Sequence, residues 1–114
     1  MIEVPPDEFA QLVGEALDSI PPELGRVMSN VAVLIDDDSP PGNLFGLYEG
    51  IPLTERVDYG GMAMPDTITI FRQTICAVCV TRAEVVDQVR TTVLHEVGHH
   101  FGIAEKRLHE LGWD

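Results

Sequence analysis

The sequence predicts an α+β domain, and three observations support this prediction. Apolar residues recur at helical spacing near the start of the chain and again towards its end. Between them lie a compact apolar run and an alternating run, both of the length typical of β-strands. At 114 residues, 45% of them hydrophobic, the chain has enough apolar material for one modest core. We therefore expect a single domain over residues 1–114.

The first predicted element is an amphipathic helix over residues 6–20. Its apolar residues share one face at spacings of three and four: Phe9, Leu12, Val13, Ala16, Leu17 and Ile20. Pro6 suits the first helical turn, because the amide hydrogen that proline lacks would have no partner there. Pro21 and Pro22 then end the helix.

Two strands are predicted in the middle of the chain. VAVLID, residues 31–36, is a continuous apolar run of strand length and predicts a buried central strand. TITIFR, residues 67–72, alternates as a half-buried strand does. Residues 44–65 are rich in glycine and proline, and we expect one short strand within a long irregular loop. ICAVCV, residues 75–80, has no clear period.

The last long element is a helix over residues 82–101 with clear signals for its start. Thr81 and Glu84 have the spacing of a capping box, and Val80 and Val85 have that of a hydrophobic staple. Four valines form one stripe along this helix and are expected to face the core: Val86, Val89, Val93 and Val97. The opposite side is polar and carries the two histidines of the motif described next.

His95, Glu96 and His99 match the pattern H-E-x-x-H. Two histidines four residues apart project side by side from a helix, and their imidazoles are able to hold one Zn²⁺ at about 2.0–2.1 Å. Glu96 lies about 100° further around the helix, so we expect it to hold a water and take its proton. A helix with exposed histidines and no metal is the alternative. The capping signals, the polar face and the glycine at position 102 count against it.

A third protein ligand would leave one position of a tetrahedral zinc site open for water. Gly102 is suited to a left-handed turn that reverses the chain, so we favour Glu105, three residues later, as this ligand. His109, about one helical turn beyond Glu105, is the alternative. Two imidazoles and one carboxylate leave a zinc unit with net positive charge, and such a site lowers the pKa of a bound water. The open position and Glu96 favour catalysis over a closed structural site.

The stretches TTVLHEVGHHFGI and RLHELGW resemble the small zincin-like metallopeptidases of bacteria, sometimes called minimal zincins. The resemblance extends through ALDSIPPEL, FGLYEGIPL and PDTITIFRQTI and so covers nearly the whole chain. It implies helices packed on a small mixed sheet, an active-site helix that crosses it, and a zinc peptidase activity. The strand TITIFR would then be either an open sheet edge that receives an extended substrate or an ordinary core strand.

Departures from the larger metzincin proteases narrow the expected substrate. Glu105 stands where metzincins carry a third histidine. No methionine follows the motif to lie beneath the metal, since Met62 and Met64 come before it. Only residues 106–114 follow Glu105, so we expect no C-terminal subdomain to form one wall of a cleft. The expected substrate is a peptide or an unstructured protein segment.

Two other functions stay open at this point. Zinc-dependent endoribonucleases of the rRNA-maturation type space three ligands as His95, His99 and Glu105 are spaced, but their third ligand is histidine and they need a basic groove. The net charge of −12 disfavours such binding to a phosphate backbone. A zinc-binding interaction module without catalysis is the second alternative, and Glu96 counts against it, because a structural site has no use for a base.

Localisation is predicted from the absence of targeting signals in this sequence. No apolar run reaches the roughly 20 residues of a membrane span, and MIEVPPDEF lacks the basic start and apolar stretch of a signal peptide. We therefore expect a cytoplasmic protein with reduced thiols and with neither a membrane nor a nucleic acid as partner.

Three residues outside the motif are interpreted as structural. Cys76 and Cys79 form a lone C-x-x-C pair, which we interpret as two packed thiols. A redox switch and a second metal half-site are the alternatives for this pair. Tyr48, between two glycines, is interpreted as a packed loop aromatic, with donation to a developing oxyanion as the alternative.

Overall fold

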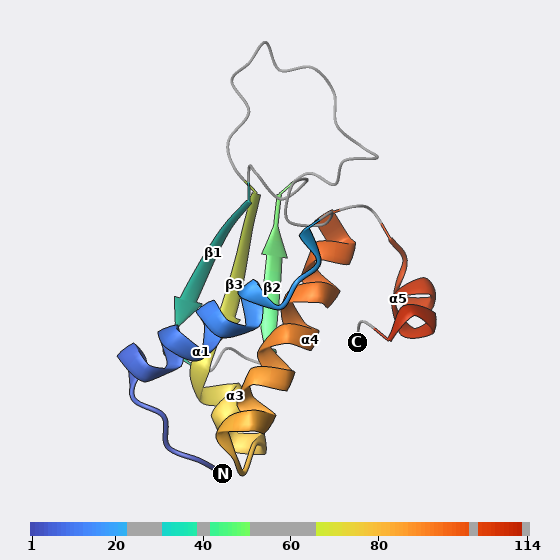
Figure 1. Cartoon of the computed structure of the whole chain (residues 1–114). Helices are drawn as coiled ribbons and strands as arrows, with labels where there is room; N and C mark the ends of the chain where they lie inside the picture. The colour runs from blue at the N-terminus through green and yellow to red at the C-terminus, as the bar shows by residue number, and fades with distance from the viewer. Residues whose placement is uncertain (23–30, 39–41, 51–65, 101–102, 113–114) are drawn as a thin grey trace.

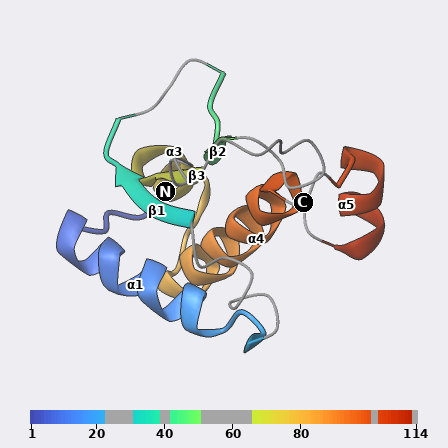
Figure 2. The same ribbon diagram turned by 90° about the horizontal axis from the view of Figure 1, so that it is seen from above.

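The computed structural model describes residues 1–22, 31–38, 42–50, 66–100 and 103–112 (Figure 1). In chain order, its elements are α1 (Pro6–Asp18), β1 (Val31–Asp36), β2 (Gly46–Glu49), β3 (Asp66–Phe71), α3 (Arg72–Val78), α4 (Arg82–His100) and α5 (Glu105–Leu111). The three strands form one mixed sheet, and α1 and α4 lie side by side on one of its faces (Figures 1 and 2). The predicted α+β architecture is confirmed, with helices packed on a small mixed sheet.

The strand order is β1-β3-β2, so the central strand is β3. β1 pairs with it in parallel and β2 pairs with it antiparallel. The prediction that residues 31–36 form a buried central strand is therefore wrong. Their continuous apolar run indicated burial on both faces, but within the described residues β1 pairs only with β3, and Leu34 is 52% exposed. Ile68 and Ile70 of β3 are fully buried instead, because β3 has neighbours on both sides and packs against α4.

Helix α1 begins at Pro6 as predicted and ends at Asp18, slightly before the predicted residue 20. Four residues of the predicted apolar face are buried, namely Phe9, Leu12, Val13 and Ala16, and the other two, Leu17 and Ile20, are partly buried. They join the isoleucines of β3 and the valines of α4 in one apolar core. Because α4 contributes valines along most of its length, burial of this stripe fixes the rotation of the helix that carries the motif.

Helix α3 contains the first part of the segment without a clear period, up to Val78, and one residue that was assigned to a strand. β3 ends at Phe71, and Arg72, predicted as the last strand residue, begins α3. Arg72 donates hydrogen bonds to the Asp37 carboxylate (2.7 Å) and to the backbone oxygen of Val4 (2.8 Å). It thereby links the end of β1, the N-terminal segment and the start of α3.

None of the helices in the described part of the chain is both long enough and apolar enough to cross a lipid bilayer.

Candidate metal centre

Helix α4 starts with a variant of the predicted capping box. The Thr81 hydroxyl accepts a hydrogen bond from the Glu84 amide (3.1 Å), which satisfies one of the unpaired amides at the helix start. The Glu84 carboxylate accepts one from the amide of Val80 (2.7 Å), one residue before the expected partner. Val85 is fully buried, but Val80 is 65% exposed and contributes little as a staple. The start of the helix is thus fixed mainly by hydrogen bonds.

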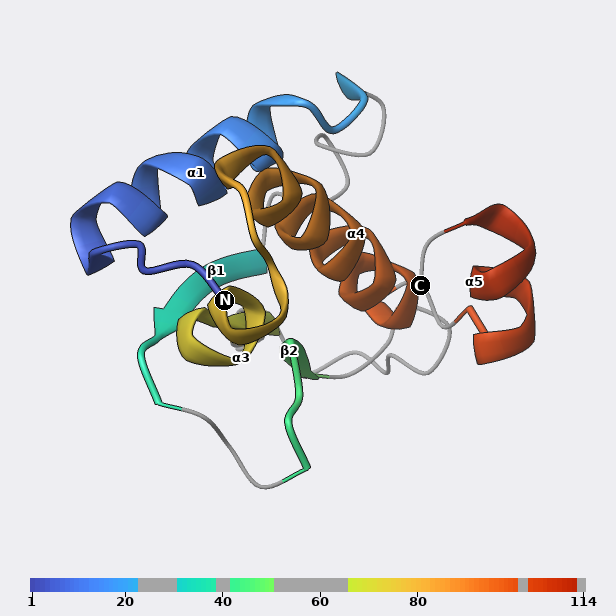
Figure 3. The same cartoon turned by 90° about the horizontal axis from the view of Figure 1, so that it is seen from below.

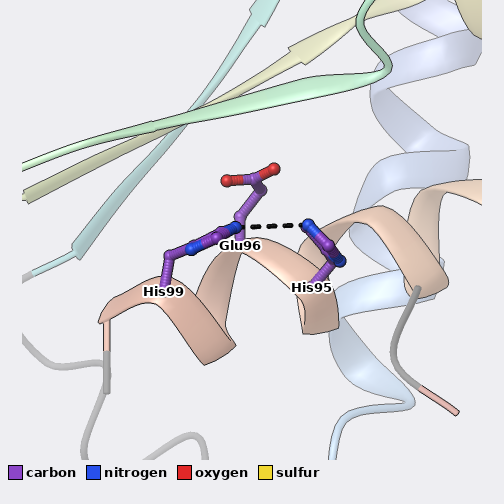
Figure 4. A group of neighbouring side chains, drawn as sticks. All are labelled: His95, Glu96 and His99. Atoms are coloured by element: carbon purple, nitrogen blue, oxygen red, sulfur yellow. Dashed lines mark hydrogen bonds between the residues drawn. The ribbon is translucent and has the colours of Figure 1, made fainter. Parts of the chain in front are cut away.

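The valine stripe turns the polar face of α4, with His95 and His99, away from the core. Val89, Val93 and Val97 are fully buried, whereas the side chains of His95 and His99 are 23% and 34% exposed. The two imidazole Nε2 atoms lie 3.2 Å apart, and the rings meet edge to face (Figure 4). Two nitrogen ligands therefore converge on one point at the surface of the helix.

Glu105, the first residue of α5, brings a carboxylate to the same point. Its Oε1 atom lies 2.9 Å from Nε2 of His99 and 3.3 Å from Nε2 of His95. Helix α5 stands beside the C-terminal half of α4, which allows this approach (Figure 3). The structure thus brings together the three residues that the sequence analysis favoured as ligands.

The spacing of these three atoms fits a zinc ion. At metal–ligand distances of about 2.0–2.1 Å, the ligands of a tetrahedral site lie about 3.3 Å apart. The observed separations of 2.9, 3.2 and 3.3 Å are close to this value. Two imidazoles and one carboxylate are also the donor set that zinc takes in many catalytic sites. His95, His99 and Glu105 are therefore compatible with zinc in both geometry and chemistry.

Glu96 occupies a different environment from Glu105. Its side chain points from α4 towards β2 (Figure 4), and the residue is only 8% exposed. Burial raises the pKa of the Glu96 carboxyl above its ordinary value, while the neighbouring His99 and His95 and a hydrogen bond with the Tyr48 backbone act in the opposite direction. A buried carboxyl with a raised pKa beside a metal site is suited to proton transfer.

The carboxylate of Glu96 also lies near the imidazoles, because candidate ligand atoms of His95, Glu96 and His99 all fall within 4.8 Å of one another. These three residues could hold a metal ion without Glu105. The side chain of Glu105 is 66% exposed and contacts both imidazoles. It can therefore bind a metal without moving, whereas Glu96 would have to leave its buried position. We therefore favour Glu105 as the ligand and Glu96 as the base.

His109, the alternative third ligand, lies in the last turn of α5 and is exposed. Among the described residues, the group of close ligand atoms contains neither His109 nor Glu105. Glu105 differs from His109 in its measured approach to both imidazoles. The turn predicted at Gly102 lies outside the described residues. Beyond it, the Ile103 amide donates a 2.8 Å hydrogen bond to the carbonyl oxygen of Gly98, so the chain does return towards α4 before α5 begins.

The C-x-x-C pair is part of the core. Cys76 and Cys79 are 6% and 4% exposed and carry free thiols. Burial raises the pKa of both thiols. A raised pKa keeps a thiol protonated and unreactive at neutral pH, so packed thiols are favoured over a redox switch. Within the described residues, neither cysteine belongs to a cluster able to hold a metal.

Tyr48 packs against the core from strand β2 and not from a loop. Its hydroxyl donates a 2.5 Å hydrogen bond to the carboxylate of Asp66, a residue that is 2% exposed. This engagement favours the structural interpretation of Tyr48 over donation to an oxyanion.

Two features of the site were not predicted from the sequence. The first is Gly98, against which Leu108 of α5 packs. A glycine inside a helix lowers stability by about 0.5–1 kcal/mol relative to alanine. Its presence within the predicted helix was the sign in the sequence that this position has a role in packing. The second is a cavity of about 210 Å³ between the start of β2 and α4, partly lined by His95 and Glu96. It depends on a contact between distant segments and has no signal in the sequence.

The sequence over residues 28–113 matches the family described as zincin-like metallopeptidase. This range covers most of the chain and contains all the residues of the candidate centre. Comparison with curated proteins finds no match.

Proposed function

Because the chain belongs to the zincin-like metallopeptidase family, we propose that it is a zinc-dependent hydrolase that cleaves peptide bonds. One observation carries this proposal. Nε2 of His95, Nε2 of His99 and Oε1 of Glu105 converge at separations of 2.9–3.3 Å beside the buried carboxyl of Glu96. We also propose that it acts in the cytoplasm, where the free thiols of Cys76 and Cys79 would stay reduced.

In this proposal, metal binding and proton transfer are carried out by different residues of the centre. His95, His99 and Glu105 hold the ion. Bound Zn²⁺ would lower the pKa of a water towards about 7 and polarise the carbonyl group of the substrate. Glu96 accepts a proton from the attacking water and passes it to the nitrogen of the departing amine. The hydrogen bond with the Tyr48 backbone holds the Glu96 side chain in one position between these two steps.

We propose that the substrate is an extended peptide that lies along β2. The sequence left residues 67–72 open as either a sheet edge or a core strand, and the structure supports the second alternative, because β3 is the central strand. In the described part of the chain, β2 is an edge strand that pairs with β3 and packs against α4. The Tyr48 backbone is already engaged by Glu96, so a peptide would pair with the other backbone groups at this edge. A peptide added to this edge would lie above the histidines of α4, because β2 passes over Glu96 (Figure 4).

The cavity beside the centre would receive one side chain of this peptide. Its walls come from residues 44–46 on one side and from Gln88, Thr91 and Thr92 of α4 on the other. At about 210 Å³ it is smaller than the usual site for a drug-sized ligand, and apart from His95 and Glu96 of the centre itself none of its wall residues is ionisable. We therefore propose an uncharged, mainly apolar side chain next to the cleaved bond.

Enlarging Thr91 should test the role of the cavity. Thr91→Met would fill part of the space, and we expect the KM of peptides with an apolar side chain at this position to rise about tenfold. Thr91→Val removes the hydroxyl but keeps the shape of the side chain, and a cavity that receives an apolar side chain should then keep KM within about twofold. Steady-state kinetics on one peptide series would measure both. Equal KM values for Thr91→Met and Thr91→Val would refute the proposed role of the cavity.

Peptide cleavage that depends on zinc is the direct test of the function. Protein loaded with one zinc ion per chain should cleave members of a library of short unstructured peptides near neutral pH, with products identified by mass spectrometry. A chelator should abolish cleavage, and added zinc should restore it, because the ligand set remains intact. A zinc-loaded protein that cleaves nothing in a broad library would instead be a non-catalytic zinc-binding module. Release of nucleotides from RNA would identify it as an endoribonuclease.

A further inference from the structure

The histidines of α4 are flanked by two structures on opposite sides. At about 100° per residue, Glu96 and Gly98 lie about 80° to either side of the line midway between His95 and His99. Glu96 faces β2, and Gly98 faces α5. The catalytic base and the third ligand are therefore supported from different sides of the same helix.

Helix α5 is attached to α4 at Gly98 in two ways. A Cβ atom at position 98 would lie 2.1 Å from Cδ2 and 3.2 Å from Cγ of Leu108, so the Leu108 side chain would have to shift to make room for it. Leu108 is fully buried. The carbonyl oxygen of Gly98 also accepts the hydrogen bond from the Ile103 amide, two residues before α5 begins. Gly98 thus contacts both the segment that leads into α5 and the buried Leu108 side chain of α5.

Glu105 lies close to this attachment on the same helix. Glu105 and Leu108 are three residues apart on α5 and so share one face of that helix. The side chain of Glu105 is 66% exposed, so its position depends on the backbone that carries it and little on packing around it. When Leu108 packs onto Gly98, Oε1 of Glu105 comes within 2.9 Å of His99 and 3.3 Å of His95.

We propose that Gly98 and Leu108 are positioning residues that deliver Glu105 to the metal. The proposal rests on the ligand set of the proposed function. Leu108 packed against the bare Cα of Gly98 sets the distance and rotation of α5, and neither residue touches the metal or the substrate. A larger residue at position 98 displaces Leu108, and α5 then carries Glu105 away from the histidines.

Zinc affinity, measured by competition with a chromophoric chelator, tests this proposal without any need for activity. Gly98→Ala should weaken zinc binding about 10–100-fold, the usual effect of removing support for a metal ligand. Adding Leu108→Val to Gly98→Ala removes the Cδ2 atom that the new methyl group would meet, and the double variant should recover to within about threefold of wild type. Gly14→Ala is the matched control. Gly14 is also a helical glycine but has open space around it, and this change should leave zinc affinity unaltered.

The same change in a Glu105→Ala background separates positioning from general damage to the fold. If Gly98 acts through Glu105, Gly98→Ala should change zinc affinity less than about twofold once Glu105 is absent. Equal weakening in both backgrounds would overturn the proposal, and so would a wild-type affinity for Gly98→Ala. If Glu105→Ala alone leaves zinc affinity unchanged, the ligand set is wrong and the positioning role falls with it.

A second variant keeps the test decisive if Gly98→Ala does not fold, as judged by circular dichroism without zinc. Leu108→Val alone leaves a gap over Gly98 and adds no atom, so it loosens α5 without a clash. It should weaken zinc binding in the wild-type background and not in Glu105→Ala. Unchanged zinc affinity of Leu108→Val in the wild-type background would overturn the proposal.

Discussion

Replacing Glu105 with alanine is expected to weaken zinc binding more than about 100-fold. Loss of an outer partner of a metal ligand already costs about 10–100-fold in affinity, and loss of a ligand itself should cost more. Glu105→Ala would leave the Nε2 atoms of His95 and His99, 3.2 Å apart, and the buried carboxyl of Glu96, which is engaged by the Tyr48 backbone. Chelator competition at fixed pH would measure the change.

The matched control is His109→Ala, which removes the alternative ligand from the same helix. His109 is exposed in the last turn of α5, while Glu105 opens the helix against the two imidazoles. We therefore expect His109→Ala to stay within about twofold of wild type in zinc affinity. If His109→Ala weakened zinc binding more than Glu105→Ala does, His109 would be the third ligand. Helix α5 would then have to lie in a different orientation against α4.

The motif-bearing helix was predictable because its signals are local. Capping at Thr81 and Glu84, the valine stripe, and the polar face with His95 and His99 all follow from spacing within one segment. Burial of the valines fixes the rotation of α4, and the histidines on its opposite face therefore point away from the core. The approach of Glu105 also followed from a short separation along the chain, since only residues 100–104 lie between His99 and this residue.

The order of the strands was not predictable in the same way. Hydrophobicity predicted that residues 31–36 form a strand, and they do, but it assigned them the central place that β3 holds. A continuous apolar run predicts burial on both faces, whereas the place of a strand in a sheet depends on which segments pair with it. Leu34, exposed to 52%, shows that an apolar edge residue can stay in contact with solvent.

The surroundings of the metal centre were missed because they arise between segments. Gly98 stood inside the quoted motif, but its partner Leu108 lies on another helix, and nothing local links the two. The burial of Glu96 has the same origin. Its side chain lies beneath β2, and Gly46 allows that strand to pass close to α4, since a Cβ there would lie 2.5 Å from Cγ2 of Thr92 and 3.5 Å from Cγ of Glu96. The sequence thus predicted which residues lie together at the candidate centre, and the packing between segments determines what surrounds them.

Replacing Glu96 with glutamine is expected to abolish peptide hydrolysis while zinc stays bound. Glutamine has nearly the same size, and its side-chain oxygen can keep the hydrogen bond with the Tyr48 backbone, but the amide cannot accept the proton of the attacking water. Removal of a general base costs about 10²–10⁴ in rate. Initial rates on a peptide that the wild type cleaves would measure the loss, with zinc content determined on the same samples.

Stability provides the second readout of this variant. Glu96 is 8% exposed, and burial raises its pKa, which means that the charged form is disfavoured in this position. The neutral amide of Glu96→Gln avoids this penalty, so the midpoint of thermal unfolding should not fall. Glu110→Gln makes the same chemical change at an exposed residue of α5 and should alter neither rate nor zinc content. Cleavage by Glu96→Gln at the wild-type rate would show that Glu96 is not the base. Loss of zinc from Glu96→Gln would instead make Glu96 a ligand, as its closeness to His95 and His99 permits.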